Sequence, residues 1–285
     1  MEKGDNTMKN LVLNNGVLMP AIGFGTYAVT DGEGEEVIKQ AVKEGYRLFD
    51  TAAFYDNEVE VGRALLSCGV DRSELFVTSK VWRTNLGYEN VRASFEQSLE
   101  RLGFEYLDMF LLHWPREDAE NPEWKTIIQE SWRALEDLYD EGKIKAIGLS
   151  NFLPHHLDVI LEKARIKPAV NQLELHVGYL QETAVNYSKE HGIILQAWSP
   201  LGRMRVSEHK TIKNMAAKYG ITTAQLLLGF LYNEGYCVIP KTSSKERLKA
   251  NLDIENIEIS REDTFILKTL PQLGWSGEHP DFVEV

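Results

Sequence analysis

Cysteine is scarce in this chain. Only Cys68 and Cys237 occur among 285 residues, far apart in the sequence. Two such residues favour reduced, partly buried thiols over a disulfide or a metal site, and we expect no metal. The chain also lacks any run approaching the ~18 apolar residues of a membrane span. Its first ten residues are polar and lack the apolar stretch of a secretory signal, so we expect a cytoplasmic protein.

Basic residues are fewer than acidic residues in this chain. The sequence holds 31 Lys and Arg against 43 Asp and Glu, a net charge of −12 with histidines neutral. This balance argues against nucleic acid or an anionic membrane surface as a partner, while it leaves room for a local basic pocket that binds a phosphate. The hydrophobic fraction of 43% is that of a soluble globular protein able to bury a sizeable core.

No Pro/Ser-rich linker, low-complexity tract or charge block divides the chain, so we expect one domain over residues 1–285. Asn15-Gly16 lies between two apolar triplets and predicts a hairpin, because the turn needs positive φ. Beyond it, apolar runs typical of strands alternate with segments of helical period. The expected strands are residues 21–25, 46–50, 75–81, 106–113, 143–150, 168–175, 193–199 and 237–241.

Eight strands with intervening helices is the count of a (β/α)8 TIM barrel, which is the α/β fold we expect. A doubly wound open sheet is the competing architecture, and it normally shows a glycine-rich phosphate turn after the first strand. Residues 23–27 read GFGTY, lack the third glycine and open no helix, so the barrel is preferred. The expected helices are residues 34–45, 91–103, 132–142, 155–166 and 211–220.

Each expected strand ends in a polar or aromatic residue. In a barrel these ends converge on one mouth, where barrel enzymes do their chemistry. Strands buried on both faces are nearly continuously apolar, so a charged residue at such an end needs a reason. A single Asp there is more often a helix cap, but joint occurrence favours a functional site. These residues are Thr26, Asp50, Lys80, His113, Ser150, Asn151, Gln172, Trp198, Ser199 and Lys241.

Asp50, Tyr55, Lys80 and His113 suit the reduction of a carbonyl group. A tyrosine pKa near ~10 is too high for efficient proton donation at neutral pH without help. A neighbouring ammonium lowers that pKa and an aspartate holds the ammonium in place, roles that fit Lys80 and Asp50. His113 is suited to hydrogen-bond and orient the carbonyl. The hydride must come from a nicotinamide, because no side chain carries one.

Three separated sequence patterns resemble the aldo-keto reductase family. They are GYRLFDTAAFYDNEVEVG at residues 45–62, KAIGLSNF at 145–152 and IPKTSSKERLKANLDI at 239–254. The order and spacing of the four residues above agree, and the similarity runs from about Leu11 to the end of the chain. The chain looks most like the bacterial branch that includes 2,5-diketo-gluconate and methylglyoxal reductases. The resemblance implies a (β/α)8 barrel, NADPH as cofactor and Tyr55 as proton donor.

The family pattern also implies the cofactor contacts. Asn151 and Gln172, assisted by Ser150, would hold the nicotinamide carboxamide, and Trp198 would stack on its ring. Ser199 and Leu201 would line the pyrophosphate, and Thr26 belongs to the same cofactor-binding set. The residues implied around the adenosine 2′-phosphate and the adenine are Lys241, Thr242, Ser243, Arg247 and Asn251.

That last cluster also makes physical sense without the resemblance. Residues 241–251, KTSSKERLKAN, place cations and hydroxyls at the start of a short helix. Both a helix N-terminus and an arginine fork favour a phosphate. The alternative is a solvated basic helix end.

The sequence predicts less about the substrate pocket than about the cofactor site. Aromatic residues that follow barrel strands resemble the family's pocket wall, and together with His113 they are Tyr27, Phe54, Trp82 and Trp114. Ordinary packing beneath a lid is the alternative. The short tail, residues 272–285, predicts an open mouth and small activated carbonyls such as α-dicarbonyls, aromatic aldehydes or keto-sugar acids. Arg203 and Arg205 would bind an anion or stay solvated, and solvation is preferred for Arg116.

Two rival functions share this fold. One is a cofactor-binding regulatory subunit with little turnover, against which the intact set of four residues argues. The other is an aldolase with Lys80 as the Schiff-base nucleophile, but an adjacent Asp50 favours the charged amine. Family barrels are often monomers, so a monomer is the default expectation.

Overall fold

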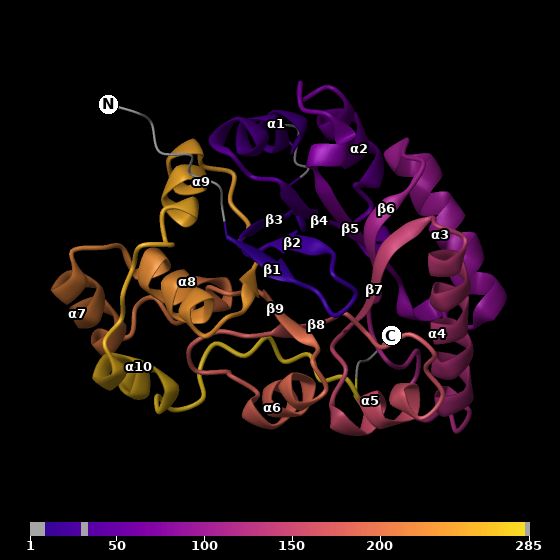
Figure 1. Cartoon of the computed structure of the whole chain (residues 1–285). Coiled ribbons are helices and arrows are strands. Elements are labelled where there is room, and N and C mark those ends of the chain that lie inside the picture. Colours follow the sequence, from indigo (N-terminus) through magenta and orange to yellow (C-terminus); the bar gives the residue numbers. More distant parts are fainter. Residues whose placement is uncertain (1–8, 30–33, 283–285) are drawn as a thin grey trace.

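The computed structural model describes residues 9–29 and 34–282, and its centre is a barrel of parallel strands ringed by helices (Figure 1). Eight strands pair in chain order, and a bridge between Ile22 and Val238 joins the first to the last. The expected barrel is therefore confirmed. The strands are β3 (Gly23–Gly25), β4 (Leu48–Asp50), β5 (Phe76–Val81), β6 (Leu107–Leu112), β7 (Ile144–Ser150), β8 (Val170–Glu174), β9 (Ile194–Trp198) and β10 (Cys237–Val238).

Helices follow the strands and cover the outside of the barrel (Figure 1). Gly103 directly follows α3 and Gly220 directly follows α7, each in the left-handed conformation that glycine adopts without strain at a helix end. The α-helices are α1 (Gly34–Glu44), α2 (Glu58–Leu66), α3 (Tyr88–Leu102), α4 (Trp124–Asp140), α5 (Pro154–Leu161), α6 (Glu182–Glu190), α7 (Lys210–Tyr219), α8 (Thr223–Asn233), α9 (Lys245–Leu252) and α10 (Arg261–Lys268).

The N-terminal hairpin closes the amino end of the barrel. Its strands, β1 (Asn10–Val12) and β2 (Leu18–Pro20), pair antiparallel, and Gly16 takes the positive φ that its turn requires. Asn14 Nδ2 donates to the carbonyl of Pro168 at 2.8 Å. Met19 is buried against apolar side chains of the barrel interior. The hairpin prediction is confirmed. Because the hairpin covers the amino end of the barrel, the carboxyl end is the one that is open to ligands.

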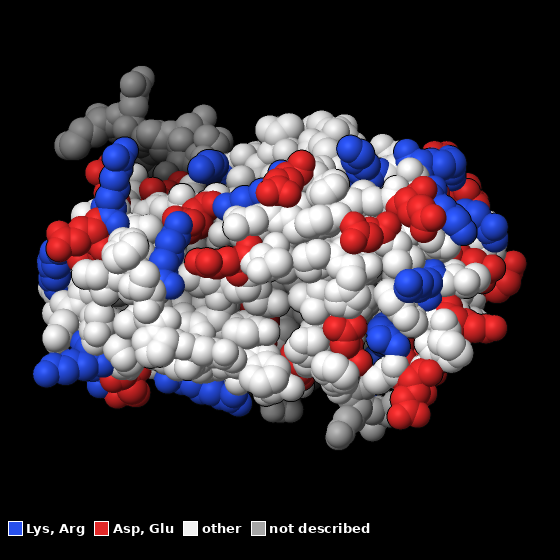
Figure 2. Space-filling model, turned by 90° about the horizontal axis from the view of Figure 1, so that it is seen from below, with Lys and Arg blue, Asp and Glu red and all other residues white. Residues whose placement is uncertain are grey.

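Charges of both signs occur on the face of the molecule that Figure 2 shows. On the face seen from below in Figure 1, acidic and basic side chains are interspersed rather than gathered into a field of one sign (Figure 2). Among the described residues, no helix is both long and apolar enough to cross a membrane.

Gly62 fixes how closely α2 packs on α3. A Cβ added there would lie 2.1 Å from the Leu102 carbonyl oxygen, which is backbone and cannot rotate away. Gly229 in α8 is also helical, but its added Cβ would meet only the Ile257 side chain, at 3.3 Å. Substitution by alanine is therefore expected to affect stability at Gly62 but not at Gly229.

We expect Gly62→Ala to destabilise the protein by about 1–3 kcal/mol, because the helices must separate to admit the methyl group. Gly229→Ala should be near neutral, because alanine favours a helix by up to about 1 kcal/mol and a side chain can adjust. Urea unfolding measures both free energies. Equal losses in the two variants would contradict the role assigned to the Leu102 carbonyl.

Candidate active site

Four side chains from neighbouring strand ends meet at the carboxyl end of the barrel. Asp50 ends β4, Lys80 lies in β5, and His113 directly follows β6. Lys80 Nζ lies 2.5 Å from Asp50 Oδ1, donates to the Thr51 carbonyl at 2.9 Å and lies 3.2 Å from the Tyr55 hydroxyl. The sequence prediction that these residues converge is therefore met, with the ammonium between the carboxylate and the phenol.

A short turn presents Tyr55 to this ammonium. Tyr55 ends the 3-10 helix η1 (Ala53–Tyr55), and Asp56 then turns the chain with φ 52°. Asn57 pins the turn, since it accepts from the Thr51 hydroxyl at 2.8 Å and donates to the Thr26 carbonyl at 2.8 Å. This buried amide thereby ties the Tyr55 turn to the ends of two strands.

Burial is the largest single influence on the pKa of both Tyr55 and Lys80. Burial raises the pKa of Tyr55 above its ordinary value of 10.0, and the Lys80 charge opposes this without reversing it. Burial lowers the pKa of Lys80, but the charges and hydrogen bonds of Asp50 and Tyr55 outweigh it and leave that pKa raised. Tyr55 is therefore a protonated phenol beside a permanent ammonium. A charged Lys80 is not a nucleophile, which disfavours the aldolase.

His113 is neutral. Burial and then the positive charge of Lys80 hold its pKa well below 6.5. Its Nδ1 is buried and makes no hydrogen bond within the described residues. Its ring lies edge-on to Tyr55 with centroids 5.8 Å apart, so the neutral imidazole and the phenol face the same space.

A polar chain runs down from the site into the barrel. Gln172 Nε2 donates to Asp50 Oδ2 at 2.8 Å and to Gln196 Oε1 at 2.6 Å. Gln196 then lies 3.3 Å from the sulfur of Cys237. Burial raises the pKa of this thiol to about 12, so Cys237 is a fully buried thiol, where the sequence predicts a reduced and partly buried one.

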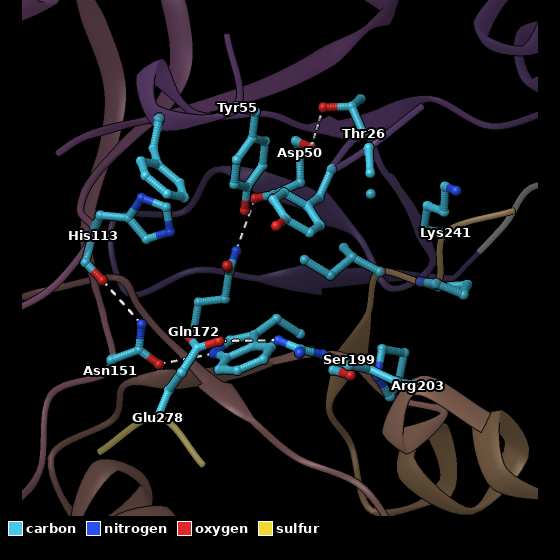
Figure 3. Close-up of a pocket in the computed structure, with 18 of the residues that line it drawn as sticks. Thr26, Asp50, Tyr55, His113, Asn151, Gln172, Ser199, Arg203, Lys241 and Glu278 are labelled. Carbon is cyan, nitrogen blue, oxygen red and sulfur yellow. Dashed lines mark hydrogen bonds and ion pairs between the residues drawn. The ribbon is translucent and has the colours of Figure 1, made fainter. Parts of the chain in front are cut away.

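These residues open onto a cavity of about 470 Å³ at the barrel mouth. One wall is aromatic: Phe54 stacks on Trp82 with centroids 3.8 Å apart, and Trp82 lies edge-on to His113 at 5.2 Å. Tyr27 packs on Tyr55 at 5.0 Å. In Figure 3, His113 lies on one side of the cavity and Lys241 on the other.

The cavity contains most of the site residues predicted from the sequence. Lys80 and Ser150 lie buried beneath it, while Thr242, Ser243, Arg247 and Asn251 lie beyond its lining, on or just before α9. The predicted residues that line it are Thr26, Tyr27, Asp50, Phe54, Tyr55, Trp82, His113, Trp114, Asn151, Gln172, Trp198, Ser199, Leu201 and Lys241.

Trp198 and Asn151 are joined across the mouth. The indole Nε1 donates to Asn151 Oδ1 at 2.8 Å, and Asn151 Nδ2 donates to the His113 carbonyl at 3.0 Å (Figure 3). The aromatic ring, the amide and the segment that carries His113 thus form one connected set.

Backbone strain is concentrated at this mouth. Seven described residues other than glycine have positive φ, and five of them line the cavity. Such conformations cost about 1–3 kcal/mol each and cluster at functional sites, because the surrounding structure must enforce them. The five are Ala28, Asn151, Ser199, Arg203 and Met204.

Sequence reasoning missed residues that hold or line the site. Glu58 is buried and accepts from Ser79 at 2.5 Å and from Arg101 at 2.7 Å, which ties α2 to β5 and α3. Glu58 stood inside a matched sequence pattern, but its partners lie far along the chain. Glu278 lines the cavity from the C-terminal segment, where no periodicity gave a signal.

The loop arginines have structural partners. Arg116 donates to the Ala119 carbonyl and lies 3.6 Å from Asp281, so it is held rather than solvated. Arg205 donates to the Trp275 carbonyl at 2.9 Å. Arg203 lines the cavity and lies 3.0 Å from Glu278.

A second cluster of histidines lies outside the cavity. Asp281 Oδ1 lies 3.0 Å from His155 Nε2 and 2.9 Å from His156 Nε2. His156 Nδ1 accepts from the Leu153 amide at 3.1 Å, so a neutral His156 carries its proton on Nε2 and donates it to Asp281. That nitrogen then has no lone pair for a metal. The cluster instead fastens the C-terminal segment to α5.

The arrangement of site and fold agrees with a known family. The model of the aldo/keto reductase family matches residues 21–270. The chain belongs to this family. As a family member it is an oxidoreductase that acts on carbonyl and alcohol groups.

Individual relatives cover nearly all of the chain. It is 44% identical over 270 residues to glyoxal reductase of Bacillus subtilis, with 94% of this chain and 95% of that protein covered. An aldo-keto reductase from a Medee basin deep-sea metagenome library superposes with TM-score 0.90 at 36% identity, covering 96% of this chain and 100% of that one. A Bombyx mori aldo-keto reductase in complex with NADP superposes with TM-score 0.85 at 29% identity, covering 92% of each chain.

The pKa directions predict how reduction depends on pH. His113 is neutral and Tyr55 is protonated throughout the neutral range, so kcat/KM should show no inflection between about pH 5 and 8. The role of proton donor that the sequence predicts for Tyr55 requires the protonated phenol, so activity should be present below the pKa of Tyr55 and lost as pH rises through it. Initial rates across pH at saturating cofactor measure this. An inflection near 6.5 that disappears in His113→Asn would contradict the neutral imidazole.

Proposed function

We propose that this reductase converts small aldehydes and ketones to alcohols with NADPH, and that Tyr55 donates the proton. The observation that carries the proposal is the position of the Lys80 ammonium, which contacts both Asp50 and the Tyr55 hydroxyl at the floor of an aromatic cavity. The name of the Bacillus subtilis relative, a glyoxal reductase, supports a small carbonyl substrate.

The side chains support a direct proton transfer. The Tyr55 hydroxyl and the neutral His113 ring face one space, so both are available to a carbonyl oxygen placed there. As negative charge develops on that oxygen, the Tyr55 proton moves to it and a phenolate forms. Lys80 stabilises the phenolate, because its ammonium is already 3.2 Å away and needs no reorganisation. Asp50 keeps the ammonium in place.

The residues at the mouth fit a nicotinamide. When bound, that group supplies the hydride that no side chain can supply. Trp198 offers a flat apolar face in the cavity, with its N–H already satisfied by Asn151. Gln172 uses its side-chain nitrogen on Asp50 and Gln196, which leaves its oxygen to accept from a carboxamide N–H. Thr26, Asn151 and Ser150 complete this half of the proposed site.

The other half of the proposed site fits phosphates. Ser199 and Leu201 line the cavity, and Lys241 lies on the side away from His113 (Figure 3). Three residues further along the chain, Ser244 caps α9 and accepts from the Arg247 amide, so a helix N-terminus follows Lys241 closely in the sequence. Thr242, Ser243, Arg247 and Asn251 would surround the 2′-phosphate and adenine. A monomeric state and a cytoplasmic location stay predictions of the sequence.

Tyr55→Phe tests the proton donor. The variant keeps the ring and loses the hydroxyl, so we expect unchanged NADPH affinity and a kcat reduced by about a hundredfold or more, the usual range for a general acid. NADPH oxidation followed by absorbance with methylglyoxal and aromatic aldehydes gives the rates, and Tyr106→Phe outside the cavity is the control. Normal turnover in Tyr55→Phe would refute the assignment. Tight NADPH binding without turnover in the wild type would favour the regulatory subunit.

Lys241→Ala and Arg247→Ala test the phosphate site. Each removes a cation proposed to contact the 2′-phosphate, so the KM for NADPH should rise about tenfold to a hundredfold, the loss expected for a charged hydrogen bond. The KM for NADH should change little, because NADH lacks that phosphate. Lys249→Ala, on the same helix but facing the opposite end of the barrel, is the control. Equal losses for both cofactors would mean that the phosphate lies elsewhere.

A further inference from the structure

A carboxylate from the C-terminal segment reaches the mouth of the cavity. Glu278 lines the same cavity as Tyr55 and His113, with 44% of its side chain exposed. Its Oε1 lies 3.0 Å from Arg203 Nη2, and Figure 3 shows the pair beside the labelled cavity residues. Apart from Asp50, which is held by Lys80 at the floor, Glu278 is the one acidic side chain in the lining that the structure describes.

Buried contacts hold Glu278 in this position. Just before it, Ser276 donates from both its amide and its hydroxyl to Glu174, a buried carboxylate at the end of β8. Just after it, Asp281 is fastened by His156. The segment is therefore tied to the barrel on both sides of Glu278, so its carboxylate belongs to the mouth rather than to a loose tail.

Two cations near Glu278 already face carboxylates. Arg203 is paired with Glu278 itself. Arg83, buried just after β5, has its pKa lowered by burial, and the negative charges of Glu117 and Glu278 oppose that shift. A substrate carboxylate entering beside the aromatic wall would therefore compete with Glu278 for positive charge and be repelled by it. An uncharged substrate meets no such opposition.

We propose that Glu278 is a specificity-determining residue that makes the site favour uncharged carbonyl substrates over those that carry a carboxylate. This inference rests on the proposed reductase function. It separates the substrate classes that the sequence leaves together, since α-dicarbonyls and simple aromatic aldehydes are uncharged and keto-sugar acids are anions.

Two aldehydes that differ in charge test the proposal. The measured quantity is the ratio of kcat/KM for para-carboxybenzaldehyde to that for para-nitrobenzaldehyde, at saturating NADPH. Glu278→Gln removes the negative charge and releases Arg203, so the ratio should rise about tenfold, equivalent to ~1.4 kcal/mol. Arg203→Gln leaves Glu278 without its partner, so the ratio should fall below that of the wild type.

The ratio is expected to change in opposite directions in the two variants, and this excludes a merely structural explanation. Either variant breaks the same ion pair, so simple loosening of the segment would move the ratio in one direction in both. Glu234→Gln, which breaks a 2.6 Å pair with Lys268 outside the cavity, is the matched control and should leave the ratio unchanged. Added salt should raise the wild-type ratio, because it screens the partly exposed carboxylate.

The result that overturns the proposal is a ratio in Glu278→Gln equal to that of the wild type, or a shift of the same sign in both variants. A wild type that turns over neither para-nitrobenzaldehyde nor methylglyoxal would instead defeat the proposed function, and this inference would fall with it. The two failures are distinct, because only the first occurs in an enzyme that is active on the uncharged aldehyde.

Discussion

The buried pair between Asp50 and Lys80 links the barrel to its chemistry. Neither side chain has appreciable contact with solvent, so the cost of removing two charges from water must be offset inside the protein. Asp50 receives a further hydrogen bond from Gln172, and Lys80 donates to the Thr51 carbonyl. Removing one partner of such a pair typically costs about 3–5 kcal/mol, because the other charge is left buried and uncompensated. The contacts that keep the strands in place therefore also keep the ammonium beside Tyr55.

Much of this arrangement could be predicted from the sequence. Alternating apolar runs and helical periods gave the eight strands, because a buried parallel strand must be apolar on both faces. The polar residues that interrupt those runs, Asp50, Lys80 and His113, were legible as a site since the carboxyl ends of parallel strands share one rim. The direction in which the pKa of Tyr55 is shifted could not be predicted from the sequence. The sequence suggests a lowered value from the ammonium, whereas burial in the folded barrel raises it.

Contacts made by irregular segments could not be predicted in this way. Glu278 and Arg203 lie in loops without periodicity, and their pairing joins positions 75 residues apart. Asn57 looks like an ordinary turn residue, yet it ties the Tyr55 turn to the ends of β3 and β4. In each case the sequence shows a polar residue of common type. Only the three-dimensional structure shows which distant backbone or charge it meets.

The hairpin that closes the amino end of the barrel limits where ligands can enter and leave. Met19 and Leu13 fill that end with apolar side chains, and Asn14 bonds to the rim. Substrate, product and cofactor must therefore all pass through the opposite opening. In the proposed reaction, the product must leave through this opening before the next substrate can occupy the same cavity. Closing one end of the barrel thus makes the departure of one molecule and the arrival of the next sequential.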